Sequence, residues 1–426
     1  MKNTHWIWDR VDSLFAIDAG KTMSARARNG REKTPFLRTS NVLWDEIDLS
    51  VLDTMEIPDK ELRKKTLTPG DLLVCEGGEI GRAAIWSGEL ETVSFQNHIH
   101  RLRPRGADVH SRFYVYFLQA AFTQLGLFEG AGNRTTIPNL SRNRLAELEI
   151  PHPRFREQVA IANALQCVRA GCKKQEQVIE SAQILKQIAM RDLFRCGLRK
   201  ESLRETDAGP IPESWGLRPL TAVCFMQSGG TPPKSDAALW KGTHPWVSGK
   251  DLKVNRLLDS TDHISEEAAR NYSKIAPAGS VLVLVRGMGL AKGFALSLIE
   301  RPMAFNQDLK ALIPNGVVNG PFLMHALTYA GQRMLQNVSA AAHGTKRLSQ
   351  SDLDQFMIPV PSEDEQNGIS AILDAIDQKI DLHKRKKAVL EELFRTLLHK
   401  LMTGEVLVSD LDLSALETTP AVEVTV

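Results

Sequence analysis

The segment "PHPRFREQVAIANAL" occupies residues 151–165, and a similar segment, "PVPSEDEQNGISAIL", occupies residues 359–373. Aligning Glu157-Gln158 with Glu365-Gln366 gives a shift of 365 − 157, or about 208 positions, which is roughly half of the 426-residue chain. Solenoid repeats have periods of about 20–50 residues. The spacing therefore predicts a duplicated domain.

Other segments recur in the same order on both sides of this pair. The two copies share an extended triplet with a polar turn, a buried strand with a Gly-rich turn, a half-buried strand and a closing Pro-x-Pro segment. Most side chains differ between the copies, so we predict one fold with two diverged surfaces. The matching segments are residues 34–42 with 244–252, 68–85 with 276–296, 95–104 with 305–314, and 132–153 with 344–361.

A long helix is predicted after each copy, because apolar residues recur at alternating steps of four and three. Ile161, Leu165 and Val168 in the first helix correspond to Ile369, Leu373 and Ile376 in the second. The equal registers favour packing of helix against helix around a pseudo-two-fold axis, and the alternative is packing of each helix on the core of its own domain. Each helix of about 40 residues would span about 60 Å and serve as a spacer.

The match between the two helices weakens beyond Ala182. Lys186 stands where the second helix has Phe394, so we expect the neighbouring Leu185 to replace Lys186 in the apolar seam.

These patterns predict an α+β fold, with two pseudo-symmetric α/β domains separated by two long helices packed as an antiparallel coiled coil. The Pro- and Gly-containing stretch at residues 205–220 is expected to be a linker into the second copy. The expected division is 1–155 for the first domain, 156–200 for the first helix, 201–364 for the linker and second domain, 365–404 for the second helix, and 405–426 for an acidic tail.

The composition is that of a soluble globular protein, and no apolar run reaches the roughly 18 residues needed to span a membrane. The first residues have no apolar signal segment, so we expect a cytoplasmic protein without a membrane partner. The net charge is +2, but the tail carries five acidic and no basic residues, which leaves about +7 on the body. Five scattered cysteines suggest neither a disulfide framework nor a zinc site.

No catalytic or metal-binding residues are predicted. The segment "VRGMGLAKG" at residues 285–293 resembles a phosphate-binding loop, but a Gly-rich turn at the same place in the first copy favours a shared β-turn. Neither a paired-histidine metal site nor a Gly-x-Ser-x-Gly nucleophile turn is present in the sequence. The sequence therefore indicates two binding modules on a spacer.

The chain resembles the specificity subunit of a type I restriction and modification enzyme over essentially its whole length. The resemblance is carried by "IPHPRFREQ" at residues 150–158, "IPVPSEDEQ" at 358–366, "GPIPESW" at 209–215 and "LLHKLMTGEV" at 397–406. The second of these lacks the apolar residue that stands at Phe155 in the first copy.

The resemblance implies a non-catalytic, sequence-specific reader of double-stranded DNA. Each domain would read one half of a bipartite site, and the helices would set the gap and dock two methyltransferase subunits. Motor-nuclease subunits would complete the assembly. No cofactor is expected in this chain, whereas S-adenosylmethionine, ATP and Mg are expected on the partner subunits.

Polar turns that match between the copies supply the predicted DNA-binding residues. Arginine suits guanine, asparagine and glutamine suit adenine, and lysine suits phosphate. For the amides, an alternative is that they cap backbone groups of their own turns. The predicted residues are Arg38, Ser40, Asn41, Arg82, Gln96, Asn97 and Arg134 in the first copy, and Ser248, Lys250, Asp251, Arg286, Asn306, Gln307, Lys346 and Arg347 in the second.

Two other functions fit the same patterns. One is the reader subunit of another type of restriction-modification system, and the other is a tandem-domain, coiled-coil scaffold that binds proteins. The DNA sequence that is read, the length of its gap and the activity of the system in restriction do not follow from the sequence.

Overall fold

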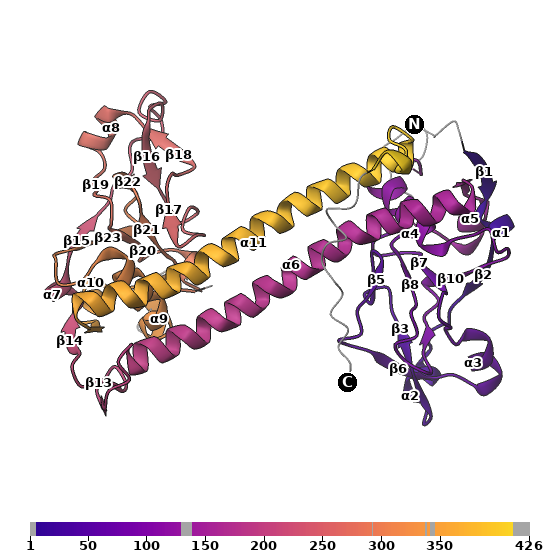
Figure 1. Ribbon diagram of the computed structural model, residues 1–426, viewed down its shortest axis with the longest axis horizontal. Coiled ribbons are helices and arrows are strands. Elements are labelled where there is room, and N and C mark those ends of the chain that lie inside the picture. The colour runs from indigo at the N-terminus through magenta and orange to yellow at the C-terminus, as the bar shows by residue number, and fades with distance from the viewer. Residues whose placement is uncertain (1–5, 129–138, 292, 337–338, 341–345, 412–426) are drawn as a thin grey trace. The chain divides into compact units, whose positions relative to one another are not determined.

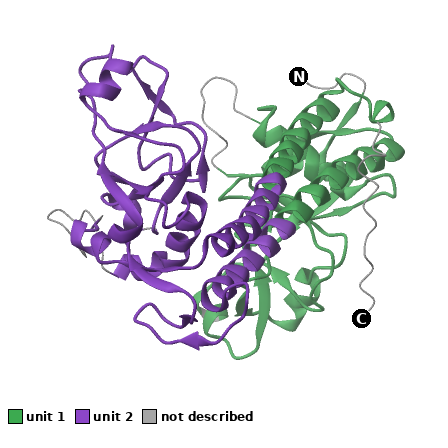
Figure 2. Cartoon of the chain, turned by 60° about the vertical axis from the view of Figure 1, so that its left-hand side comes forward, with its two compact units in different colours: residues 1–176, 384–426 green, residues 177–383 purple. Residues whose placement is uncertain are grey.

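The computed structural model describes residues 6–128, 139–291, 293–336, 339–340 and 346–411. It divides into two compact units, which are residues 1–176 with 384–426 (unit 1) and residues 177–383 (unit 2), as Figure 2 shows. Each unit combines one copy of the repeated domain with one part of each long helix. Among the described residues, no helix has the length and apolar character needed to cross a membrane.

The domain in unit 1 contains two small sheets (Figure 1). The first has the order β2-β10-β7-β8 and is antiparallel, and the second has the order β6-β3-β9, with β3 and β9 parallel. Two further antiparallel pairs are β4 with β5, which form a short hairpin, and β1 with β11, which joins the start of the domain to the strand that precedes the first long helix. The strands are β1 (Ile7–Arg10), β2 (Phe15–Ala19), β3 (Lys33–Leu37), β4 (Val42–Leu43), β5 (Glu46–Ile47), β6 (Asp53–Glu56), β7 (Leu72–Cys75), β8 (Ala83–Ile85), β9 (Ser94–Phe95), β10 (Ile99–Pro104) and β11 (Glu149–His152).

Unit 2 repeats this topology with one extra strand in each sheet. Its sheets have the orders β15-β23-β20-β21-β17 and β18-β16-β22-β19. The pair β16 with β22 is parallel, as is the pair that the added strand β17 makes with β21. The predicted duplication is therefore confirmed at the level of strand order and direction. The strands are β12 (Leu203–Arg204), β13 (Ile211–Pro212), β14 (Gly216–Pro219), β15 (Cys224–Ser228), β16 (His244–Val247), β17 (Arg256–Leu257), β18 (Asp262–Ile264), β19 (Ile275–Ala276), β20 (Val281–Leu284), β21 (Leu296–Ile299), β22 (Met303–Phe305), β23 (Leu309–Pro314), β24 (Ser339–Ala340), β25 (Lys346–Arg347) and β26 (Met357–Val360).

Helix α4 in unit 1 and helix α9 in unit 2 pack on the larger sheets, and shorter helices flank the strands. In unit 1 the helices are α1 (Val11–Leu14), α2 (Ala25–Asn29), α3 (Asp59–Lys65), α4 (Ser111–Thr123) and α5 (Arg142–Glu147). In unit 2 they are α7 (Leu220–Val223), α8 (Glu266–Asn271), η1 (Met288–Ala291), α9 (Gly320–Gln336) and α10 (Gln350–Asp354). The long helices are α6 (Phe155–Cys196) and α11 (Glu363–Thr403), and the short turn η3 (Val408–Asp410) follows α11.

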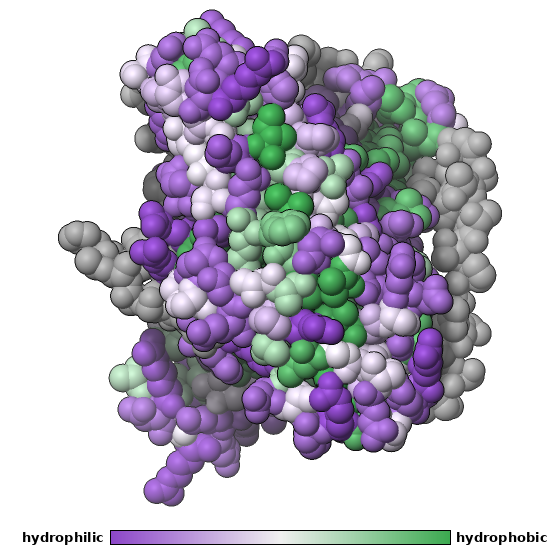
Figure 3. Space-filling model, turned by 90° about the vertical axis from the view of Figure 1, so that its left-hand side faces the viewer, coloured by the Kyte–Doolittle hydropathy of each residue, from purple (hydrophilic) through white to green (hydrophobic). Residues whose placement is uncertain are grey.

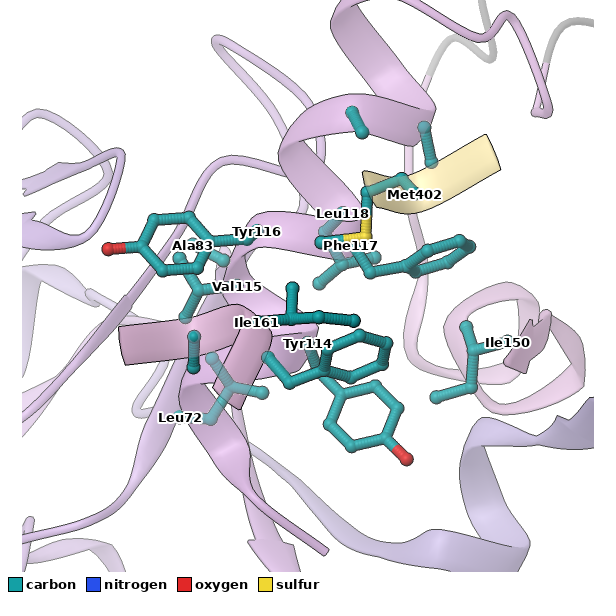
Figure 4. Packing of buried hydrophobic residues seen from close by; sticks show 14 of the residues in the cluster. Leu72, Ala83, Tyr114, Val115, Tyr116, Phe117, Leu118, Ile150, Ile161 and Met402 are labelled. Atoms are coloured by element: carbon teal, nitrogen blue, oxygen red, sulfur yellow. The ribbon is translucent and has the colours of Figure 1, made fainter. Parts of the chain in front are cut away.

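The core of unit 1 joins the sheet, α4 and both long helices in one apolar cluster. Figure 4 shows Tyr114 and Phe117 of α4 beside Ile161 of α6 and Met402 of α11, and these four side chains are all buried. Unit 2 has an equivalent cluster, in which Phe322 of α9 packs with residues of α6 and α11. Both long helices therefore supply residues to the core of each unit.

The two long helices lie side by side in opposite directions, as predicted. In unit 1 a methyl group at Gly171 would lie 3.4 Å from Leu390 Cδ1, and Lys387 Nζ lies 2.8 Å from Glu176 Oε1. In unit 2 Lys186 Nζ lies 2.6 Å from Asp377 Oδ1. The numbering rises along α6 while it falls along α11, so the predicted α+β fold with an antiparallel helix pair is confirmed.

The expected replacement of Lys186 by Leu185 in the seam is wrong. Leu185 is 55% exposed, whereas the side chain of Lys186 is only 15% exposed. Asp377 on the facing helix supplies a carboxylate to Lys186, so a cation occupies the seam position without a bare charge being buried. An apolar repeat in one helix cannot reveal a charge that the other helix neutralises.

The repeated Glu-Gln pair has the same structural role in both copies. Gln158 Oε1 accepts a hydrogen bond of 2.8 Å from His110 N, and its amide nitrogen donates to the carbonyl oxygens of Asp108 and Pro153 at 3.0 and 2.8 Å. Both amide atoms of Gln158 are thus used, and the side chain has no exposed surface. We refer to this arrangement as the amide latch, because it ties the start of α6 to the turn before α4.

Unit 2 has an identical amide latch at Gln366. Its Oε1 accepts from Asn319 N at 3.0 Å, and its nitrogen donates to Val317 and Pro361 at 3.0 and 3.1 Å. The glutamates in front of the glutamines bind tryptophans, since Trp6 Nε1 donates to Glu157 at 2.9 Å and Trp215 Nε1 donates to Glu365 at 3.0 Å. The duplicated sequence therefore encodes a duplicated attachment of domain to helix.

Replacing Gln366 by alanine should lower the free energy of unfolding by about 3 kcal/mol or more, because three buried backbone groups lose their partner at about 1–3 kcal/mol each. Gln177→Ala on the exposed face of α6 is the matched control and should change stability by less than about 0.5 kcal/mol. Urea denaturation followed by circular dichroism measures both values. Equal losses in the two variants would show that the amide latch does not stabilise the fold.

Candidate nucleic-acid interface

Three turns come together at one edge of the domain in unit 2. Asn306 N, in the turn between β22 and β23, donates to Val247 O at the end of β16 at 3.0 Å. The N–H of Val285, after β20, donates to Asp308 O at 2.9 Å, and a β-bridge joins Arg286 to Arg347. Predicted DNA-binding residues from four separate segments are therefore neighbours in space.

The side chains best placed for a ligand in this cluster are Arg286, Gln307 and Arg347, because all three residues are exposed. The structure gives the Arg286 guanidinium no hydrogen bond to the described residues. Gln307 Oε1 accepts a hydrogen bond from the Thr231 hydroxyl, which leaves its amide nitrogen for another acceptor. Lys346 lies in β25 beside this cluster.

Asn306 has a different role from its neighbour Gln307. It is 8% exposed, and its Oδ1 accepts from Asp308 N at 3.1 Å. The amide therefore stabilises its own turn, which is the capping alternative considered for these side chains.

The turn after β16 is also held by its own side chains. Asp251 accepts hydrogen bonds from Ser248 N at 2.9 Å and from Thr261 Oγ1 at 2.7 Å. Burial opposes ionisation of Asp251, but the hydrogen bonds from Thr261 and Ser248 outweigh it and lower its pKa. Lys250 is exposed and lies 2.7 Å from Asp262, a surface pair that a phosphate can replace at little cost.

The corresponding three turns of unit 1 also meet. Gln96 N donates to Leu37 O at 2.9 Å, and the Arg82 guanidinium donates to Thr39 O. Asn41 is 5% exposed, and its amide nitrogen donates to Asp48 O and Val51 O at 2.8 Å each. Asn41 is therefore a turn-capping residue.

The remaining predicted residues of unit 1 differ in accessibility. Arg38 is exposed and pairs with Asp53 at 2.9 Å, and Ser40 is exposed beside it. Arg82 is largely covered and pairs with Glu79, Gln96 is 7% exposed, and Asn97 is half-buried. Arg134 lies outside the described residues.

Two exposed side chains at these turns were missed by the sequence reasoning. His98 adjoins Asn97 and is 60% exposed, and Met288 in the turn after Arg286 is 67% exposed. The Gly-rich pattern around Met288 did indicate a turn, but neither residue has the charge or amide group on which the prediction relied. On the face drawn in Figure 3 hydrophilic residues predominate, with smaller groups of hydrophobic ones between them.

Comparisons with known proteins point to one family. A model of the type I restriction modification DNA specificity domain matches residues 5–182 and again residues 212–392. The EcoR124I/EcoR124II specificity subunit of Escherichia coli is 35% identical over 151 residues, which cover 35% of this chain and 37% of that relative. The putative MjaX specificity subunit of Methanocaldococcus jannaschii is 24% identical over 414 residues, which cover 93% of this chain and 92% of that relative.

Solved structures share the fold. The S subunit of a type I restriction-modification system from M. genitalium superposes with a TM-score of 0.61 at 21% identity, covering 94% of this chain and 97% of that one. A chain from a structure describing complex assembly of the type I R-M system gives a TM-score of 0.56 at 18% identity, covering 95% and 100%.

The predicted residues fall into an exposed group, which includes Arg286, and a buried, turn-capping group, which includes Asn306. Measuring the affinity of variants for duplex DNA tests this division. Arg286→Ala should weaken binding and reduce the slope of log affinity against log salt by about one, because one phosphate or base contact is lost. Asn306→Ala should leave that slope unchanged and lower the free energy of unfolding by about 1–2 kcal/mol, because a buried cap is lost. An unchanged slope in Arg286→Ala would remove that residue from the interface.

Proposed function

The chain belongs to the type I restriction-modification DNA specificity family, and from this membership we propose that it selects one bipartite DNA site for its system. The observation that carries the proposal is the presence of two DNA specificity domains in one chain, each with its own set of converging polar turns. Each domain would read one half of the site, and the exposed arginines and glutamine of those turns would contact bases or phosphates.

Two readers joined by one spacer give high specificity from modest individual contacts. Once one domain is bound, the second searches its half-site at a high effective concentration. The helix pair would then fix the number of unread base pairs between the two half-sites. This use of the pair requires stiffness, which two helices packed along an apolar seam provide.

We propose that methyltransferase subunits dock on the helices and bring S-adenosylmethionine, and that motor-nuclease subunits bring ATP and Mg. In this scheme the chain itself catalyses nothing and acts in the cytoplasm. Support comes from three aliphatic side chains of α6, Ile184, Leu185 and Ile188, which are 52, 55 and 45% exposed within five residues. An apolar group of this kind on a helix suits a protein partner better than DNA.

Sequencing of DNA methylation in a host with and without the gene tests the whole proposal. The gene should add one bipartite methylated motif, and replacing residues 1–150 with the same region of another specificity subunit should change only one half of it. The expected reason is that each domain reads independently. A motif that is unchanged by deletion of the gene, or altered in both halves by the exchange, would contradict the proposal.

Lengthening the helix pair should lengthen the gap. One heptad inserted after Glu176 in α6 and another after His383 in α11 falls at the boundary of the two units and leaves the packing inside each unit intact. The pair grows by about 10 Å at 1.5 Å per residue, which corresponds to about three base pairs at 3.4 Å each. The half-sites should stay the same, and methylation should be weaker because three base pairs also rotate one half-site by about 100°.

The gap is read from the methylated motif of a host that carries the lengthened variant. Heptads inserted into α6 alone are the control, since they disrupt the seam without extending the pair. An active lengthened variant that keeps the original gap would show that the helices do not measure it.

A further inference from the structure

Two pairs of positions on the long helices are equivalent by the internal repeat but differ completely in chemistry. Arg169 of α6 corresponds to Asp377 of α11, and Lys186 of α6 corresponds to Phe394 of α11, since 377 − 169 and 394 − 186 both equal 208. Arg169 and Phe394 lie together in unit 1, and Asp377 and Lys186 lie together in unit 2. We use the word joint for each pair of neighbours together with the domain loop that it binds. The joint of unit 1 contains Arg169 and Phe394, and the joint of unit 2 contains Asp377 and Lys186.

In unit 1 the joint holds the hairpin between β4 and β5. The Arg169 guanidinium donates to Trp44 O and stacks 5.7 Å above the ring of Phe394. Asp45, the next residue of the hairpin, accepts from Tyr116 Oη of α4 at 2.6 Å and pairs with Arg112 at 3.1 Å. The domain loop is thereby bonded to α4 and to α6 at once, and the Tyr116 hydroxyl points away from the core cluster (Figure 4).

In unit 2 the joint holds the segment that leads into β17. Asp377 accepts from Asn255 Nδ2 at 2.7 Å and from Lys186 Nζ at 2.6 and 2.8 Å. One turn earlier on α11, Asp374 accepts from Arg256 Nη2 at 2.5 Å. Residues 255 and 256 of the domain are thus bonded to α11, and through Asp377 to α6.

The buried aromatic residue beside each joint is also replaced. The amide latches align His110 with Asn319, a local shift of 319 − 110, or 209, so Tyr116 in unit 1 corresponds to His325 in unit 2. His325 Nε2 lies 2.9 Å from Asp374 Oδ1, and no part of its side chain is exposed. Burial opposes ionisation of Asp374, but hydrogen bonds from His325 and Arg256 outweigh it and lower its pKa. The carboxylate that completes the joint has moved from the domain loop (Asp45) to the helix (Asp374).

The same residues of unit 2 have the composition of a metal site. His325, Asp374 and Asp377 bring ligand atoms within 4.8 Å of one another. However, Lys186 and Arg256 already neutralise the two carboxylates, so a divalent cation would meet two positive charges at the same oxygens. The cluster is therefore an ion-pair network that bonds a domain to two helices.

We propose that these joints are positioning elements, which fix the angle and height of each recognition domain on the helix pair and thereby define the gap of the DNA site. The inference rests on the proposed function. The apolar core attaches each domain to the helices, but apolar contacts are not directional, whereas hydrogen bonds require short distances and aligned donors. A loosened joint should therefore leave the readers intact and let one of them shift along the DNA.

The test uses the full chain together with its partner methyltransferase, and reads both half-sites and gap from the methylated DNA of the host. Asn255→Ala and Asp377→Asn should each lower the ratio of methylation at the native gap to methylation at gaps one base pair longer or shorter by about tenfold. The first variant removes a hydrogen bond to a charged group, and the second removes the carboxylate charge that Lys186 neutralises. The half-sites should not change. Glu392→Gln is the control, because this exposed carboxylate of α11 pairs with Arg395 on its own helix and, among the described residues, with no domain loop.

Charge reversal gives a second and independent readout. Lys186→Asp and Asp377→Lys alone should broaden the gap more than Asn255→Ala does, because each places like charges together. The double variant should restore the native gap, since it rebuilds the ion pair and the Asn255 amide can accept from a lysine at position 377. Thermal unfolding of each variant establishes that the chain is folded.

Specific outcomes would overturn the proposal. An unchanged gap ratio in Asn255→Ala and Asp377→Asn, or an equal loss of methylation at every gap, would show that the joint of unit 2 contributes only to stability. If the double variant had a gap as broad as that of the single variants Lys186→Asp and Asp377→Lys, the ion pair would not be what fixes the gap. If the wild-type chain directs methylation to no bipartite motif, the proposed function fails first, and that result is distinct from the others.

Discussion

The buried amides of Gln158 and Gln366 are the constraint on which the rest of each unit depends. Each amide satisfies one N–H and two carbonyl groups where a domain strand ends and a long helix begins. Leaving those backbone groups without partners would cost about 1–3 kcal/mol for each. The amide latch therefore sets the direction in which the helix leaves the domain, and the apolar seam can form only along that direction.

The apolar seam and the joints stabilise the helix pair beyond the amide latch, and they use different kinds of interaction. Aliphatic residues such as Ile161, Leu165 and Leu373 are fully or almost fully buried and supply most of the free energy of packing. Arg169 and Asp377 supply orientation, because each bonds one atom of a domain loop. Both joints occupy the same place in the repeat, and the charge of the helix residue is reversed between Arg169 and Asp377.

Much of the fold could be predicted from the sequence because the repeat is itself evidence about structure. The shift of about 208 positions gave the domain equivalence and the helix registers, and the observed helices Phe155–Cys196 and Glu363–Thr403 begin within two residues of the expected positions. The prediction of the seam failed at Leu185. The neighbouring Lys186 is largely buried in its place because Asp377, about 190 positions away in the sequence, pairs with it. The predicted DNA contacts divided for the same reason, since Asn41 and Asn306 carry the same amide as a base-reading residue but are used by nearby backbone groups that a sequence pattern does not reveal.

The joints also show that a functional unit of this chain is not a continuous stretch of sequence. Trp44 and Asp45 of the first domain depend on Tyr116 and Arg112, which lie in the same domain, but also on Arg169, which lies in α6.

An exchange of residues 1–150 carries the first set of partners and leaves Arg169 and Phe394 behind. The hairpin of the exchanged domain must therefore place a carbonyl group where the Arg169 guanidinium of the original α6 can donate to it. A backbone carbonyl is present in every sequence, which makes the joint of unit 1 tolerant of such exchanges. The joint of unit 2 binds through the side chains of Asn255 and Arg256, so a domain that lacks them would leave Asp374 without its arginine and Asp377 with Lys186 but without its amide donor. The two recognition domains thus differ in how freely they can be replaced, with the first more exchangeable than the second.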